Sequence, residues 1–233
     1  MNTLESFRYP SFRHLLGTDN FGRDIFSRVL GGSQVVFFVG VFTVAVGLSA
    51  GFLFGALAGY FGGAADEIIM RLMDAKMAFP GVILALVLIA IFGTGLINTA
   101  LALGIMSIPR FCRITRAGFM QIKEMDYIKA AKARGVPLFT LIFRHILPNI
   151  TSSLVVTATL GFSSAVLSEA GLSYLGLGIQ PPDPSWGKML YEAQSFLLTQ
   201  PWYAFIPGIM ITLMVLGFNL LGDGLRDIND NTQ

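Results

Sequence analysis

Charged side chains are scarce in this chain, and that scarcity sets the class of protein. Asp, Glu, Lys and Arg make up 13% of the 233 residues, whereas 54% are hydrophobic and the mean hydropathy is +0.67. Ordinary soluble domains carry about 25% charged residues. The sequence therefore predicts a protein of the lipid bilayer.

The residues that build redox, metal and nucleotide sites are also few. Cys112 has no partner for an internal disulfide, and His14 and His145 lie far apart without other ligands at metal-binding spacing. The sequence contains no Gly-rich phosphate loop, and no nucleophile, base and orienting group can be assembled from it. We therefore predict no catalytic residue, no metal site and no cofactor bound by this chain. A net charge of only +2 argues against a nucleic-acid partner.

Long apolar runs are present instead. A transmembrane helix needs about 20 mostly apolar residues. The candidate spans are 29–60, 77–92, 95–109, 152–167 and 203–221. The second and third are short and meet at residues 92–95, so we predict a tight helical hairpin there, with one re-entrant element as the alternative. The predicted fold is all-α, a polytopic bundle of about five transmembrane helices.

Basic residues indicate the cytoplasmic side. The segment 110–144 holds eight Arg and Lys residues, and cytoplasmic loops carry an excess of both. Alternation then places 180–201 outside, 61–76 and the C-terminal tail inside, and the N-terminus outside. The four arginines before residue 29 contradict the last placement, because no preceding span carries them across. A missing first helix would resolve this conflict.

The segment 125–149, MDYIKAAKARGVPLFTLIFRHILPN, is a polar, basic island between apolar runs. Asp126 is a suitable N-cap for a two-turn helix, and Gly135 suits the left-handed position that ends it. Pro137 prevents continuation and suits the start of a second helix, LFTLIFRHIL, which Pro148 ends or kinks. The two helices make an elbow.

The first helix of this elbow has two possible uses. Ala130 and Ala131 give it slim sides that fit a groove on another protein. Lys129 and Lys132 equally suit an amphipathic helix that rests on the bilayer surface. The residues alone leave both uses open.

Glycines recur every fourth residue in the first span. They are Gly47, Gly51, Gly55 and Gly59. Such a stripe lets another helix backbone approach closely. We predict helix packing, either within one bundle or against a second membrane subunit, and both can hold together.

Glu169 is the one clear carboxylate near a span, at the outer end of the fourth. One carboxylate makes no proton relay, so we expect the driving energy to enter elsewhere. Glu169 is either an interfacial residue that caps a helix end or a substrate contact. Three prolines between 181 and 184 predict an external turn before a short helix, and Trp186 suits the membrane–water boundary. Glu169 and Trp186 are our candidates for the external, substrate side.

Several motifs resemble those of one family. Lys129-Ala130-Ala131, Gly135 and Ile146-Leu147-Pro148 resemble the EAA loop of inner-membrane subunits of binding-protein-dependent ABC importers. Flanking segments are similar to the peptide/nickel group of that family. These are Leu16-Gly17-Thr18-Asp19, Gly22-Arg23-Asp24, Arg71-Leu72-Met73-Asp74 and the run from Glu169 to Gly178. The likeness extends from about Leu15 to Asp227 and is specific for the family but weak for the cargo.

The resemblance implies a type I importer permease fold with a cytoplasmic coupling helix that inserts into an ATPase. The implied coupling residues are Asp126, Lys129, Ala130, Ala131, Gly135, Pro137, Leu147 and Pro148. The implied partners are a second related permease, two ATPase subunits that bind ATP and Mg, an extracytoplasmic substrate-binding protein and membrane lipid. We expect a multi-pass protein of the cytoplasmic (inner) membrane.

The predicted function is a non-enzymatic permease subunit for di- and oligopeptides. Nickel or another small solute is the alternative within the group, and a self-sufficient channel or secondary carrier is the alternative of a different class. The predicted divisions are an external or interfacial segment at 1–28, a permease domain at 29–227 with its coupling loop at 110–150, and a cytoplasmic tail at 228–233.

Two departures from the family pattern bear on these expectations. Lys129 stands where the family's loop often has Glu, so Asp126 cannot complete a reciprocal capping box, and helix entry is weakened by about 0.5–1 kcal/mol. Family members also carry an additional N-terminal helix. This agrees with the orientation conflict and leads us to expect either an internal start or a short form.

Overall fold

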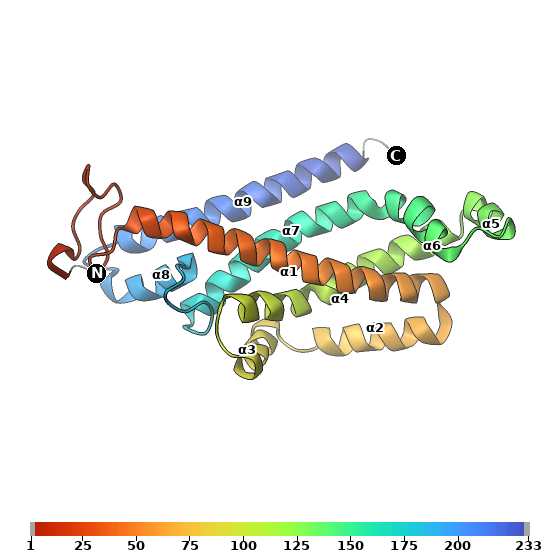
Figure 1. Cartoon of the computed structure of the whole chain (residues 1–233), viewed down its shortest axis with the longest axis horizontal. Coiled ribbons are helices and arrows are strands. Elements are labelled where there is room, and N and C mark those ends of the chain that lie inside the picture. The colour runs from red at the N-terminus through yellow and green to blue at the C-terminus, as the bar shows by residue number, and fades with distance from the viewer. Residues whose placement is uncertain (1–2, 231–233) are drawn as a thin grey trace. The chain divides into compact units, whose positions relative to one another are not determined.

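The computed structural model describes residues 3–230, which fold into helices joined by short loops (Figure 1). The helices are η1 (Thr3–Glu5), α1 (Ile25–Phe61), α2 (Gly63–Met77), α3 (Gly81–Phe92), α4 (Leu96–Lys123), α5 (Asp126–Ala133), α6 (Leu138–Thr140), η2 (Leu141–Ile146), α7 (Leu147–Tyr174), α8 (Trp186–Ala193), η3 (Gln194–Phe196) and α9 (Trp202–Asp230). Among these residues, extended backbone pairs at the isolated bridge Thr18–Asp24. The all-α prediction is confirmed.

Three helical segments are long and apolar enough to cross a bilayer, namely α1, the continuous run Leu138–Tyr174 and α9. Helices α2 and α3 meet at 93° and pass the same test together, so the described residues offer three spans, or four if the bent pair is one. This count is below the five predicted. Helix α3, at 12 residues, is only about 18 Å long, and α4 carries three arginines among its 28 residues.

Helix boundaries differ from the prediction at three places. The third span was expected to end at Pro109, but α4 continues through this proline to Lys123, because a long helix tolerates one missing backbone hydrogen bond. Helix α1 begins at Ile25, where the Asp24 carboxylate accepts a 2.8 Å hydrogen bond from the Ser27 N–H. Residues 228–230, predicted as tail, belong to α9, and 231–233 lie outside the described residues.

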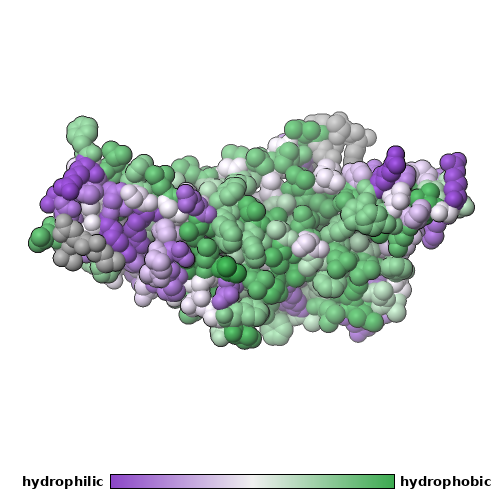
Figure 2. Space-filling view, viewed as in Figure 1, coloured by the Kyte–Doolittle hydropathy of each residue, from purple (hydrophilic) through white to green (hydrophobic). Residues whose placement is uncertain are grey.

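The chain forms two compact units. The first comprises Met1–Phe42, Val82–Leu103 and Ser163–Gly217. The second comprises Thr43–Gly81, Gly104–Phe162 and Phe218–Gln233. Figure 2 shows polar side chains gathered over the N-terminal segment of the first unit and over α5 in the second.

Trp186 lies in the interior of the first unit. Its side chain is fully buried, and Nε1 donates a 3.0 Å hydrogen bond to the Val29 carbonyl. The ring fills a notch at Gly32, where an added Cβ would lie 2.7 Å from the indole. The ring therefore packs inside the protein and is not exposed to lipid or water, because burial against α1 satisfies both the ring and its N–H.

Glu169 is also buried rather than interfacial. Its Oε1 accepts hydrogen bonds of 2.6 Å from Ser173 Oγ and 2.7 Å from Ser185 Oγ. Ser185 in turn caps α8 through a 3.3 Å bond from the Lys188 N–H. Glu169 therefore ties α7 to the start of α8, and the surface position predicted for it is wrong.

A polar cluster of Asp19, Arg23, Arg28, Glu192 and Tyr203 holds two of the four arginines that precede residue 29. Arg28 Nη1 lies 2.8 Å from the buried Asp19 carboxylate and 2.7 Å from Glu192 Oε2. Arg23 bonds the same two acids at 2.5 and 2.6 Å. Arg23 and Arg28 are thus held by acids of the same unit, and the side of the membrane on which the N-terminus lies stays a prediction.

Within the second unit the glycine stripe of α1 packs against α4. A Cβ added at Gly51 would lie 2.5 Å from Phe111 Cβ, and one at Gly55 would lie 2.5 Å from the Cys112 carbonyl. Gly59 meets Phe119 in the same way, and Gly47 lies against Ser107. The stripe is thus occupied by a helix of the same chain, the first of the two predicted alternatives.

Candidate ATPase-coupling site

Helix α5 is held on the second unit by one buried side chain. Ile128 is 2% exposed and belongs to an apolar cluster with Phe119 and Ile122 of α4 and Leu141 and Ile146 of η2. Burial of one such side chain stabilises the attachment by about 1.5–3 kcal/mol. The inward face of α5 is thereby fixed to the body of this unit.

The end of α5 is built as the sequence predicts. Gly135 has φ of +75°, which an L side chain adopts only with strain. The Val136 N–H donates to the Ala131 carbonyl at 3.2 Å, and the Gly135 N–H donates to the Lys132 carbonyl at 3.0 Å. These two bonds form a Schellman motif, which stops α5 after two turns.

The start of α5 differs from the prediction. Met125, with extended backbone, is the N-cap, and no side-chain bond caps the helix. Asp126 is the first helical residue, where its charge still favours the helix dipole. The N-cap role assigned to Asp126 is therefore wrong, and so is the capping-box argument about Lys129. Lys129 Nζ instead lies 3.3 Å from Glu124 Oε2.

The second arm of the elbow is continuous with α7. Pro137 is the N-cap of α6, which passes through the π-helical turn η2 into α7. Pro148 does not end the helix as expected. The wider π turn immediately before this proline accommodates its ring and its missing N–H, so the run from Leu138 to Tyr174 is unbroken.

The structure divides the predicted coupling residues into two sets. Ala131 and Leu147 are half-buried and pack against the apolar cluster. The outward set is exposed and consists of Asp126, Lys129, Ala130, Gly135, Pro137 and Pro148. Tyr127 and Phe139, 46% and 71% exposed, add apolar surface beside it. Figure 1 shows α5 at a tip of this unit, so the outward set is available for contact.

Two ion pairs between α2 and α4 were missed. Arg116 binds Asp66 through both side-chain arms, with Nη2 to Oδ2 at 2.6 Å, and Arg113 Nη2 lies 2.6 Å from Asp74 Oδ1. The spacing of the two aspartates could have indicated these pairs, because residues eight apart share a helix face. In the sequence the two arginines were interpreted only as charges that set the topology.

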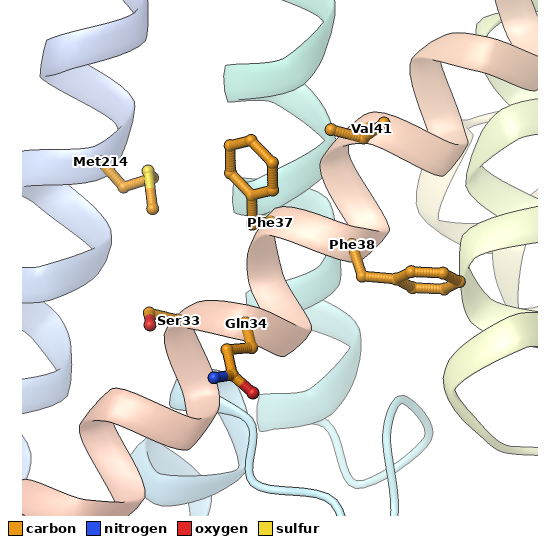
Figure 3. Close-up of a pocket in the computed structure, with 6 residues that line it drawn as sticks. All are labelled: Ser33, Gln34, Phe37, Phe38, Val41 and Met214. Carbon is orange, nitrogen blue, oxygen red and sulfur yellow. The ribbon is translucent and has the colours of Figure 1, made fainter.

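A groove in the first unit was also missed. It has a volume of about 580 Å³ and is lined by Ser33, Gln34, Phe37, Phe38, Val41 and Met214. Figure 3 shows Phe37 of α1 and Met214 of α9 on facing sides of it. Gln34 and Ser33 place an amide and a hydroxyl beside apolar side chains. The adjacent polar pair Ser33-Gln34 within an apolar span was the available signal.

Comparison with known proteins identifies the family. A model of the binding-protein-dependent transport system inner membrane component matches residues 51–232. The glutathione transport system permease protein GsiD of Pectobacterium atrosepticum is 48% identical over 221 residues, covering 95% of this chain and 73% of that protein. The dipeptide transport system permease protein DppC of Alkalihalophilus pseudofirmus is 45% identical over 229 residues, covering 98% and 75%.

Solved structures agree on the fold. The MetNI methionine ABC transporter, in an inward-facing conformation, matches with a TM-score of 0.67 at 18% identity, over 88% of this chain and 95% of that one. An amino acid ABC transporter matches with a TM-score of 0.64 at 16% identity, over 85% and 92%. With its apolar helices and its family match over most of its length, this chain belongs to the inner membrane components of binding-protein-dependent transport systems and is a multi-pass protein of the cytoplasmic membrane.

Proposed function

We propose that the chain is the permease subunit of an ATP-driven importer of short peptides. The relatives named above support this cargo, since they transport glutathione and dipeptides, and a third from Pseudomonas aeruginosa is a di/tripeptide permease. All of these cargoes are small peptides. Nickel, the alternative from the sequence, has no such support.

The observation that carries the coupling role is the two-sided character of α5. One face is anchored by Ile128, whereas Ala130 and Gly135 on the other side lie open. A short helix with small outward residues fits a groove on a second protein, and a rigid attachment transmits movement of that protein to α4 and α7. A helix that only rests on lipid needs no such attachment.

ATP and Mg are bound, in this proposal, by two separate ATPase subunits. The family's dependence on a binding protein implies an external partner. A second, related permease completes the membrane part. Closure of the ATPases moves the elbow as a rigid body and shifts the spans between inward-open and outward-open states.

The groove beside Gln34 supports a peptide cargo. Its lining residues carry no charge, and the Gln34 amide can both donate and accept a hydrogen bond, as a peptide backbone requires. A transport path must bind its cargo weakly enough to release it. A largely apolar groove with one amide meets that requirement.

Ala130→Trp tests the coupling role. The large ring on the exposed face should leave the fold intact but block docking, so a P-loop ATPase that accompanies the tagged wild-type chain through mild purification should be lost. Ser195→Trp, at an exposed site in the first unit, is the matched control and should keep the ATPase. Gly135→Trp is a less specific test, because the positive φ strains any side chain.

Cysteine cross-linking makes the same test by contact. Cys112 is buried, so Ala133→Cys introduces the one exposed thiol among the described residues. We expect it to cross-link to the ATPase, whereas Ser195→Cys should not. Peptide uptake into liposomes by the purified chain without any ATPase would refute the importer and establish a self-sufficient carrier.

A further inference from the structure

A basic pocket lies in the second unit where α5 meets the ends of α1 and α4. Its volume is about 260 Å³. It is lined by Tyr60, Lys123, Glu124, Ile128, Lys129, Lys132 and Leu141. Three ammonium groups face one carboxylate, so the lining has a surplus of two positive charges. Lys129 also belongs to the outward set, whereas Lys123 and Lys132 have no part in the coupling function described above.

Each lysine of the pocket has a contact within the protein and keeps further N–H donors. Lys123 Nζ donates a 2.8 Å hydrogen bond to the Gly59 carbonyl, and Lys132 Nζ lies 5.7 Å from the centre of the Tyr60 ring. Lys129 Nζ is 3.3 Å from the Glu124 carboxylate. Each ammonium has three N–H donors, so every one of them keeps donors for a further acceptor. The pocket is thus preformed for an anion.

The position of the pocket along α1 indicates which anion. Tyr60 precedes Phe61, the last residue of a helix long and apolar enough to span the membrane, so the pocket lies at one end of that helix. The basic residues of 110–144 indicate that this is the cytoplasmic end. Leu53, Leu57 and Phe61 follow at helical spacing and are 56%, 38% and 61% exposed. They form an apolar strip that leads to the same end of α1.

We propose that this pocket binds the phosphate of an anionic phospholipid in the cytoplasmic leaflet, with an acyl chain along the apolar strip. A soluble phosphate shares the headgroup chemistry, but the strip has a use only for a lipid. Basic pockets at the cytoplasmic ends of spanning helices attract anionic headgroups. The lipid joins α5 to the ends of α1 and α4 and leaves Ala130 and Gly135 open for the ATPase.

Native mass spectrometry of the purified complex in phosphatidylcholine nanodiscs containing a minor fraction of phosphatidylglycerol tests this. The test variant is Lys129→Gln with Lys132→Gln, and Lys123 is kept because it holds the Gly59 carbonyl. The control, Arg71→Gln with Arg144→Gln, removes the same charge from exposed sites outside the pocket. Wild type and control should retain phosphatidylglycerol, and the test variant should bind it about 30-fold more weakly.

Three results would overturn the proposal. Equal loss of phosphatidylglycerol in both double variants, or equal retention of phosphatidylcholine, would show general charge attraction without a site. Occupation by millimolar inorganic phosphate, with no gain from phosphatidylglycerol, would assign the pocket to a soluble anion. Unchanged hydrogen exchange across α5 in the test variant excludes unfolding as the cause of weaker binding.

Discussion

Charged side chains are buried in the polar cluster of the first unit but exposed at the tip of the second. The tip is α5 (Asp126–Ala133) with the residues around it. In the cluster, Asp19 and Glu192 each meet both Arg23 and Arg28, and little of any of these side chains is exposed. At the tip, Asp126 and the residues around it lie in water. Buried charges must be satisfied by partners within the protein. The charges of the cluster are therefore paired within the unit, whereas those of the tip are exposed, as the proposed contact with an ATPase requires.

Removing one cation from the cluster should have the largest effect. Arg28→Met leaves Asp19 and Glu192 with Arg23 alone, and an uncompensated buried charge costs about 3–5 kcal/mol of unfolding free energy. The Tm of the purified protein in detergent should fall clearly. Arg13→Met, at a side chain that is 75% exposed, should change the Tm little. Equal falls in Tm would mean that the buried ion pairs of the cluster stabilise the protein no more than an exposed ion pair does.

Loosening the anchor of the tip should have the next largest effect. Ile128→Ala removes packing from the apolar cluster and should cost about 2–4 kcal/mol. Hydrogen exchange across α5 should rise and the ATPase should dissociate. Tyr127→Ala, at the exposed neighbour, should leave exchange unchanged while weakening ATPase binding. If both variants loosen α5 alike, the division into an inward and an outward face fails.

A smaller effect concerns the charge that caps α1. Burial of Asp24 raises its pKa, but hydrogen bonds from the Ser27 backbone and hydroxyl and the contact with His14 outweigh this, so the net pKa is lowered. The stabilisation is complete above the unfolded pKa of about 3.9 and is lost as pH falls through the lower folded pKa.

Asp24→Asn keeps the cap but removes the charge, which should cost about 1 kcal/mol near neutral pH. The Tm difference between the two proteins should disappear as the pH is lowered below about 4. A Tm difference that persists in acid would mean that the substitution acts through side-chain geometry rather than through the charge of Asp24.

Local chemistry was predictable from the sequence, and contacts between distant segments were not. The stop at Gly135 was predicted correctly because a glycine, a following proline and two backbone bonds decide it within seven residues. The burial of Trp186 was not predicted because it depends on Gly32, a residue more than 150 positions away. Arg28 was misread for the same reason, since Glu192 is 164 residues away.

Errors within the elbow have a different origin. The cap at Asp126 was displaced by one residue, because Met125 already has the extended backbone that begins the helix. Pro109 and Pro148 did not break their helices, since packing in a long helix compensates for one missing backbone bond. Residue preferences locate a helix better than they locate its exact ends.

The π turn at Leu141–Ile146 sets the rotational phase of helix α7. An α-helix turns by about 100° per residue, so a turn with one extra residue rotates the rest of the rod by that amount about its axis. Ile150 and Leu154 of α7 face the apolar cluster in this phase. Deleting one residue from the turn would rotate both side chains away from the cluster, although every amino acid of α7 stayed the same. The face of α7 that is buried therefore depends on the turn before it as well as on the sequence of α7.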